Sequence, residues 1–234
     1  MSSGLEHSLI DRQVALLLLD RPAVRNALDS ALVRSLTEAI ARYVELPCLR
    51  AIVLGSTVRA MFCAGADLSI DDAERREVSD ALYGLYEQLV TAGVPVIAAV
   101  DGPTVGGGAQ LALAADVRIG SADARFRFAG PGHGLAVGPW ALPSTVGRRG
   151  LELVVSQRFV AAAEAAQWGL LDRIVPEPLV AALELASGIA QLDAAAVRRA
   201  KEHVVRGEHL LERMRAERSG NAAVFTGTVT RATR

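Results

Sequence analysis

Short apolar runs that alternate with longer segments of helical periodicity constrain the fold of this chain most strongly. Three of the runs are typical of buried strands: QVALLLLD (13–20), LRAIVLGS (49–56) and PVIAAVDG (95–102). Between them, residues 27–46 and 73–92 space their apolar side chains as amphipathic helices do, and Asp29 or Ser30 is placed to cap the first helix. This alternation predicts a largely parallel sheet with helices outside it.

The C-terminal part has a different character. From about residue 139 to about residue 220 the patterns are helical, apart from one short strand expected at 172–176. Two further short strands are expected at 116–121 and 124–128. The sequence therefore predicts an α/β core followed by a helical region, with no internal repeat.

Composition and charge exclude several classes of partner. The 234 residues carry a net charge of −1, and their basic side chains are mostly scattered, which does not favour nucleic acid. The longest apolar runs are too short to cross a bilayer, and the first residues lack the pattern of a secretory leader. Cys48 and Cys63 lack the spacing of metal ligands. We expect a soluble, cytoplasmic protein with no metal, no nucleic-acid partner and no membrane partner.

Two glycine-containing loops follow predicted strands, where α/β proteins place binding sites. They are FCAGADL (62–68) and DGPTVGGG (101–108). Glycine lets a ligand approach the backbone closely, and one N–H donor from each loop would suit a developing oxyanion. The alternative is that the glycines only permit tight packing of a helix against the sheet. The spacings of a phosphate loop and of a dinucleotide fingerprint are both missing.

Four segments together resemble the crotonase superfamily, the enoyl-CoA hydratase/isomerase family. They are LDRPAVRNALD (19–29), FCAGADL (62–68), the run at 95–128 and AAEAAQWGLLDRIVP (162–176). The resemblance implies an α/β crotonase fold, in which repeated ββα units form a spiral core at 1–190 and a helical trimerisation segment follows at 191–234. It also implies a homotrimer or a dimer of trimers.

The resemblance assigns an oxyanion hole to the backbone N–H groups of Ala66 and Gly107. These groups would polarise the thioester carbonyl of an acyl-CoA and stabilise its enolate. Coenzyme A would enter as the thioester substrate, with no covalently bound cofactor. The positions that match the family's CoA-binding segments are Ala23, Arg25, Ala27, Ala64, Asp67 and Leu68. Arg25 could meet a CoA phosphate or be a solvated surface residue, and Asp67 could equally be a turn or capping residue.

The chain departs from the family at both catalytic acids. Hydratases of the family carry one glutamate directly after GGG-x and another after a proline about twenty residues later. Here the first position is Gln110, and the second aligned position is Gly132. Because an amide cannot act as a base at neutral pH, hydration by two glutamates is not expected. Glu152 and Glu164 lie in C-terminal helical patterns and do not replace the missing acids.

His133 is the candidate replacement, because it stands beside the missing second acid in a glycine-flanked loop. Imidazole suits acid–base work near neutral pH, and the alternative is an exposed loop histidine with no role. Trp140 could line the acyl group, although core packing is favoured for it. Cys63 is interpreted as a packing residue. We therefore treat Gln110 and His133 as candidate catalytic residues beside Ala66 and Gly107.

The sequence predicts an acyl-CoA-processing enzyme that forms a thioester enolate. Hydration is the family's default reaction, but decarboxylation or C–C bond hydrolysis fits the missing acids better, because loss of CO₂ gives an enolate without a carboxylate base. Two alternatives stay open. One is a catalytically silent acyl-CoA-binding or scaffold homologue, and the other is a cleft that takes a non-thioester carbonyl substrate.

Overall fold

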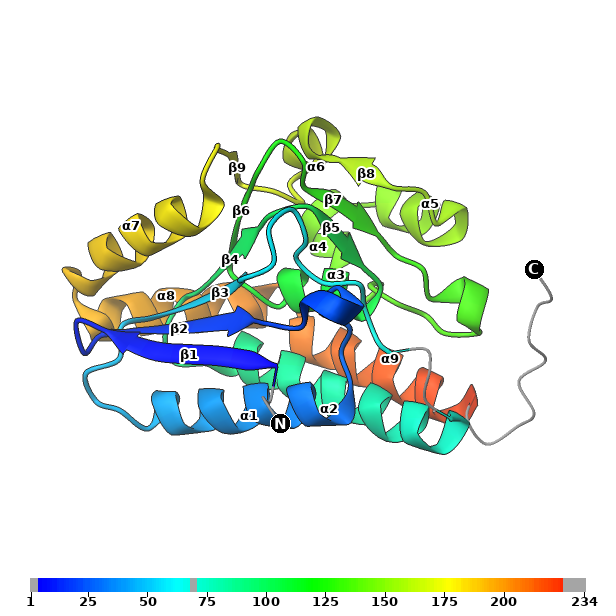
Figure 1. The fold of residues 1–234 in the computed structure, drawn as a ribbon, viewed down its shortest axis with the longest axis horizontal. Coiled ribbons are helices and arrows are strands. Elements are labelled where there is room, and N and C mark those ends of the chain that lie inside the picture. Colours follow the sequence, from blue (N-terminus) through cyan, green and yellow to red (C-terminus); the bar gives the residue numbers. More distant parts are fainter. Residues whose placement is uncertain (1–3, 68–70, 225–234) are drawn as a thin grey trace.

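The computed structural model describes residues 4–67 and 71–224, and a six-stranded sheet forms their centre (Figure 1). In spatial order its strands are β1 (Leu5–Ile10), β2 (Val14–Leu19), β3 (Ala51–Ser56), β4 (Val96–Val100), β6 (Val117–Gly120) and β9 (Arg173–Ile174). β1 is antiparallel to β2, and all other neighbours are parallel. The expected parallel sheet is confirmed, while the edge strand β1 was not predicted.

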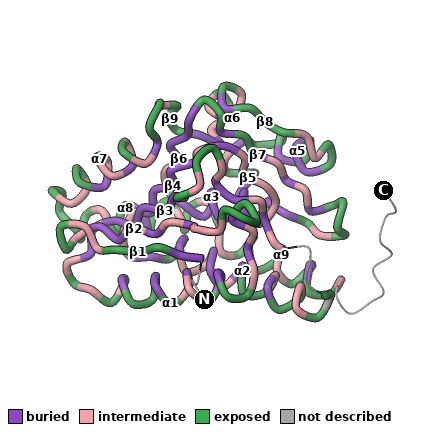
Figure 2. Tube along the Cα trace, viewed as in Figure 1, coloured by how far each residue is buried: buried purple, intermediate pink, exposed green. Residues whose placement is uncertain are grey.

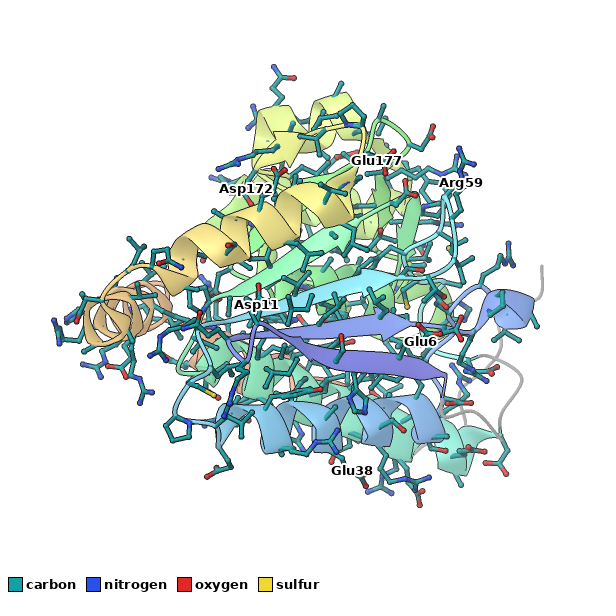
Figure 3. All side chains as sticks on the ribbon, turned by 60° about the vertical axis from the view of Figure 1, so that its left-hand side comes forward. Glu6, Asp11, Glu38, Arg59, Asp172 and Glu177 are labelled. Atoms are coloured by element: carbon teal, nitrogen blue, oxygen red, sulfur yellow. The ribbon has the colours of Figure 1, made fainter. Side chains whose placement is uncertain are left out.

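Helices cover both faces of this sheet. Leu17 and Leu54 belong to a buried cluster with Leu36 of α1 (Ser30–Val44), on the side that α2 (Asp72–Thr91) also covers. Val53, the neighbour of Leu54 on β3, points to the opposite face because successive strand side chains alternate. There it packs with Ala182 of α7 (Pro178–Ala190), the helix that crosses the strands in Figure 3. Figure 3 also labels Glu177, just before the first turn of α7.

The start of α1 is fixed by a side-chain cap. Asp29 has extended backbone angles, and its carboxylate accepts the N–H of Leu32 at 2.8 Å. This bond satisfies one of the amide groups that a helix start leaves unpaired. The expectation of a cap at Asp29 or Ser30 is therefore confirmed for Asp29.

A smaller sheet lies beside the main one and carries the connections that follow β4. It contains β5 (Pro103–Val105), β7 (Arg125–Arg127) and β8 (Val160–Ala161). β5 leads through Gly106 into α3 (Gly107–Leu113), which is buried along its whole length. The remaining short elements are η1 (Pro22–Val24), η2 (Pro131–His133), α4 (Leu142–Val146), α5 (Arg149–Ser156) and α6 (Ala162–Trp168). Exposed residues gather on the outer faces of the helices, and buried residues in the middle of the molecule (Figure 2).

The C-terminal helices α8 (Ala194–Gly207) and α9 (Leu210–Val224) confirm the expected helical region. α9 runs beside α2 in Figure 1, and Arg218 of α9 holds Asp80 of α2 through two bonds of 2.6 and 2.7 Å. Among the described helices, none alone is long and apolar enough to cross a membrane; α7 and α8 qualify only as a pair bent by 116°. The boundary between residues 190 and 191 and the homotrimer stay predictions.

Candidate active site

Three loops meet at one edge of the sheet because β2, β3 and β4 are parallel and their carboxyl ends coincide. The loop after β2 is joined to the loop after β3, since the N–H of Leu28 donates to the carbonyl oxygen of Gly65 at 2.8 Å. The loop after β3 is joined to the segment after β4, since the N–H of Val105 donates to the carbonyl oxygen of Cys63 at 3.0 Å. The two glycine-containing motifs are therefore fixed against each other.

Glycine is required at two positions of this contact. Gly65 has φ of +95°, and a Cβ there would lie 2.7 Å from the carbonyl oxygen of Val105. A Cβ on Gly108 would lie 2.7 Å from Sγ of Cys63. Real Cβ atoms avoid such distances, so side chains at these positions would push the loops apart. Gly108 therefore permits close packing of α3, although against the loop that carries Cys63 and not against the sheet as the alternative interpretation expected.

The backbone N–H groups of Ala66 and Gly107 lie at the same contact. A Cβ built on Gly65, the residue before Ala66, would be 3.6 Å from the nitrogen of Gly107. Across residues 4–67 and 71–224, neither N–H donates to a backbone oxygen. Both residues line one cavity of about 120 Å³, whose apolar wall includes Val78, Leu82, Val105, Leu135 and Val137.

Gln110 stands one turn after Gly107 in α3, and its side chain is held on one side. Its Oε1 atom accepts the indole N–H of Trp140 at 2.7 Å and the backbone N–H of Gly138 at 3.2 Å. These bonds occupy the carbonyl end of the amide, and its NH₂ group is the donor toward the hydroxyl of Tyr83. Trp140 is buried and stacks on Tyr86, so the expectation that it packs in the core is confirmed.

A buried carboxylate that the sequence pattern did not identify lies behind this wall. Glu217 of α9 accepts the hydroxyl of Tyr83 at 2.8 Å, the N–H of Trp140 at 2.8 Å and the N–H of Gly138 at 3.2 Å. Asn221, one turn later, donates from Nδ2 to the hydroxyl oxygen of Tyr83 at 2.7 Å. Tyr83 and Asn221 line the cavity. The C-terminal helix therefore contributes to the site.

The environment of Glu217 changes its acid strength. Burial raises its pKa to about 7, although the hydrogen bonds from Tyr83, Trp140 and Gly138 act in the opposite direction. Burial, followed by the charge of Glu217, raises the pKa of Tyr83. No local sequence signal marks this group, because Met214 is the one apolar member of the buried face that it shares with Glu217 and Asn221.

The four predicted catalytic residues come together. Ala66, Gly107, Gln110 and His133 all line the cavity, and His133 stands in the exposed turn η2. Gly132 is missing from the described lining residues, and a Cβ there would lie 2.9 Å from Oε1 of Gln157 instead. The catalytic roles of these residues stay predictions.

The predicted CoA-binding residues divide into three groups. Ala64 and Asp67 line the cavity, and Leu68 lies outside the described residues. The remaining three lie on the neighbouring loop and not among the described cavity-lining residues: Ala23, Arg25 and Ala27. That loop adjoins the site, because the N–H of Ala64 donates to the carbonyl oxygen of Arg25 at 3.0 Å. Arg25 is exposed, which fits both interpretations of it.

Other polar candidates have structural partners. Burial raises the pKa of the Cys63 thiol to about 12, and its Sγ donates to the carbonyl oxygen of Asn26 at 3.0 Å, as a packing residue would. Glu152 and Glu164 both bind Arg158, at 2.9 and 2.7 Å. In the part of the chain that the structure describes, no group of three His, Cys, Asp or Glu residues could hold a metal ion.

Known proteins are similar to this chain in both sequence and fold. Residues 10–234 match the model of the enoyl-CoA hydratase/isomerase family. The probable enoyl-CoA hydratase echA6 of Mycobacterium tuberculosis is 39% identical over 187 residues, which cover 78% of this chain and 75% of that protein. A probable enoyl-CoA hydratase of Rhodobacter capsulatus is 41% identical over 176 residues, or 72% and 67% of the two chains.

Solved structures agree. The enoyl-CoA hydratase of Bacillus anthracis superposes with a TM-score of 0.83 at 27% identity, covering 95% of this chain and 90% of that one. Protein PA4980 of Pseudomonas aeruginosa gives a TM-score of 0.77 at 32% identity, covering 93% and 99%. The expected α/β crotonase fold is thereby confirmed.

Proposed function

The chain belongs to the enoyl-CoA hydratase/isomerase family, and from this membership we propose that it converts acyl-CoA thioesters through an enolate intermediate. The carbonyl oxygen of the thioester would accept the N–H groups of Ala66 and Gly107. These donors would bind it more strongly as negative charge develops in the transition state. The acyl chain would lie against the apolar wall that includes Leu82 and Val137.

One observation carries this proposal. The N–H groups of Ala66 and Gly107, from two loops, lie at one cavity, and neither has a backbone acceptor among the described residues. Two converging donors without an internal acceptor are what an oxyanion requires. CoA itself would extend past Ala64 onto the loop that carries Ala23 and Arg25, which is joined to the cavity rim.

We propose a reaction that does not use two glutamates. Gln110 cannot take a proton at neutral pH, and Gly132 directs its Cβ position toward Gln157. Decarboxylation or C–C bond hydrolysis of an acyl-CoA meets this restriction better than hydration, because the bond that breaks supplies the enolate electrons. Asp67 is the one carboxylate among the described cavity-lining residues, and it stands in the Gly65 loop.

Binding and turnover test the proposal separately. Calorimetry with acetoacetyl-CoA should detect binding by the wild-type protein. Turnover is followed with malonyl-CoA, for loss of CO₂, and with crotonyl-CoA, for loss of the conjugated thioester absorbance. We expect turnover of an acyl-CoA ester by a reaction other than hydration with two glutamates. Binding with no turnover of any ester would identify a silent acyl-CoA-binding homologue, and absence of binding would refute the proposal.

A backbone variant tests the oxyanion hole directly. Ala66→Pro removes one N–H donor, whereas the control Ala66→Gly keeps it. We expect Ala66→Pro to slow turnover by about 100–1,000-fold, as loss of one oxyanion donor does elsewhere. Ala66→Gly should stay close to wild type. Equal rates in the two variants would remove Ala66 from the oxyanion hole.

A further inference from the structure

We propose that Tyr83 is the proton-transferring side chain of this site, and that Glu217 exchanges the proton with it from the buried side. The inference rests on the proposed enolate chemistry and supplies the acid–base group that the motif positions lack. Glu217 touches the substrate only through Tyr83, so it is a positioning residue and Tyr83 is the catalytic one.

The geometry of Tyr83 suits this role. It lines the same cavity as Ala66 and Gly107. Its hydroxyl donates to Oε1 of Glu217 at 2.8 Å and accepts Nδ2 of Asn221 at 2.7 Å. A phenol oxygen has one hydrogen and two lone pairs. Asn221 and the amide of Gln110 both donate toward this oxygen, so a proton from a bound ligand reaches it by displacing Gln110. Asn221 would also stabilise negative charge that develops on this oxygen.

Glu217 is expensive to bury, which argues for a use. It is 8% exposed, and its partners Tyr83, Trp140 and Gly138 are all neutral. Among the described residues, it forms no ion pair with a Lys, Arg or His side chain. A buried carboxylate without a cation opposes folding when it is charged. Such groups beside a cavity are candidates for proton transfer, and burial also raises the pKa of Glu217 to about 7, near the working range of a general base.

The proposed step conserves protons and electrons. The Cα–H bond of the acyl-CoA breaks, and its electron pair forms the enolate, whose oxygen accepts the N–H groups of Ala66 and Gly107. Oη of Tyr83 takes the proton while its own proton passes to Oε1 of Glu217, which becomes a neutral carboxylic acid. The reverse sequence protonates Cα of an enolate that has formed by another bond cleavage.

The proton exchange should depend on the charge of Glu217. Two titratable groups of α2 lie beside Glu217, and they are Tyr83 and Tyr86. On its own helix, Arg213 donates to the carbonyl oxygen of Trp140, and Arg218 pairs with Asp80 of α2. His133 also lines the cavity from η2. Since Glu217 accepts a proton only when ionised, exchange should rise as the pH increases through about 7 and then level off.

Isotope exchange tests the proposal without knowledge of the natural acyl group. Butyryl-CoA is incubated with the protein in D₂O, and deuterium at Cα is followed by NMR across pH 5.5–8.5. Tyr83→Phe should slow exchange by about 100-fold or more, the usual size of a general acid–base effect. Glu217→Gln should slow it and remove the rise near pH 7. Two variants serve as matched controls. Tyr43→Phe removes a hydroxyl that contacts His7, and Glu212→Gln changes an exposed carboxylate on the same helix as Glu217.

Binding of butyryl-CoA by calorimetry separates the outcomes. Exchange by wild type, with slow exchange but retained binding in Tyr83→Phe, supports the proposal. Wild-type binding without exchange overturns it, and so does wild-type exchange that Tyr83→Phe leaves unchanged. Loss of the pH rise in His133→Ala, with the rise retained in Glu217→Gln, assigns the base to His133 and also overturns it. Failure of wild type to bind any acyl-CoA instead overturns the proposed function. If Glu217→Gln does not fold, Tyr83→Phe still decides.

Discussion

The indole N–H of Trp140 donates to Oε1 of Gln110 at 2.7 Å, and this bond sets which end of the amide faces the cavity. The backbone N–H of Trp140 in turn donates to Oε2 of Glu217 at 2.8 Å. The N–H of Gly138 lies 3.2 Å from both Oε1 of Gln110 and Oε1 of Glu217. The amide and the carboxylate therefore form one buried assembly, and a change in one affects the other.

Gln110→Glu should destabilise the protein in a pH-dependent way. The variant places a second carboxylate next to Glu217, around the same Gly138 N–H, and two buried carboxylates resist ionising together. We expect the free energy of unfolding at pH 8 to fall by about 1–3 kcal/mol, with a smaller loss at pH 5.5. Urea titrations at both pH values measure the difference. An equal loss at both would refute repulsion as the cause.

Restoring both family glutamates should not create a hydratase. In Gln110→Glu with Gly132→Glu, the new side chain at 132 begins at a Cβ position 2.9 Å from Oε1 of Gln157. It therefore starts away from the cavity that Gln110 lines. We expect no hydration of crotonyl-CoA beyond that of Gln110→Glu alone. Clearly faster hydration of crotonyl-CoA by the double variant than by Gln110→Glu alone would show that the turn η2 rearranges to bring residue 132 into the cavity.

The stability of the protein should fall between pH 4.5 and 7 because of Glu217. Burial raises its pKa from 4.5 to about 7. In that range the folded protein keeps a proton that the unfolded chain has released, so the contribution of this group is complete below pH 4.5 and is lost by about pH 7. The loss amounts to about 3 kcal/mol, since each pKa unit corresponds to about 1.4 kcal/mol.

The comparison of wild type with Glu217→Gln isolates this effect. Urea unfolding at pH 5, 6, 7 and 8 gives the slope of stability against pH for each protein. The variant should show a shallower decline between pH 5 and 7, whatever its absolute stability. Parallel slopes would mean that the pKa of Glu217 is close to its ordinary value in the folded protein.

Much of the main sheet could be predicted from the sequence because its strands are buried on both faces. The apolar runs at 13–20 and 49–56 become β2 and β3, whose side chains meet helices on either side. β1 escaped prediction because it is an edge strand with Glu6, His7 and Ser8 exposed in the middle of it. Its pattern carries too little apolar signal, and pairing with β2 decides its structure.

The candidate site could be predicted in part, because some of its residues belong to short contiguous motifs. Ala66, Gly107 and Gln110 lie in contiguous motifs, so local sequence marks them. Tyr83 and Glu217 are 134 residues apart and meet only because α9 packs along α2. Nothing local to ERMRAERSGN shows that the face carrying Glu217 is buried. Such a pair depends on tertiary packing, which periodicity alone does not describe.

The last prediction concerns the anchor of α8. Nζ of Lys201 donates to Oδ2 of Asp116 at 2.7 Å and to the carbonyl oxygens of Leu89 and Val94 at 3.0 Å each. Lys201→Ala removes a buried cation and leaves the two carbonyl oxygens without this donor, whereas the carboxylate of Asp116 stays partly open to solvent. We expect it to lower the free energy of unfolding by about 1–3 kcal/mol, the usual cost of leaving buried hydrogen-bonding groups without a partner.

Arg158→Ala is the exposed counterpart of this variant. It removes the ion pairs with Glu152 and Glu164, which are partly open to solvent, and should cost less than about 1 kcal/mol. Urea unfolding of both variants at pH 7 makes the comparison. Similar losses would show that Lys201 contributes no more than a surface cation does. A large loss for Lys201→Ala alone would identify burial, rather than the number of bonds, as the source of its strength.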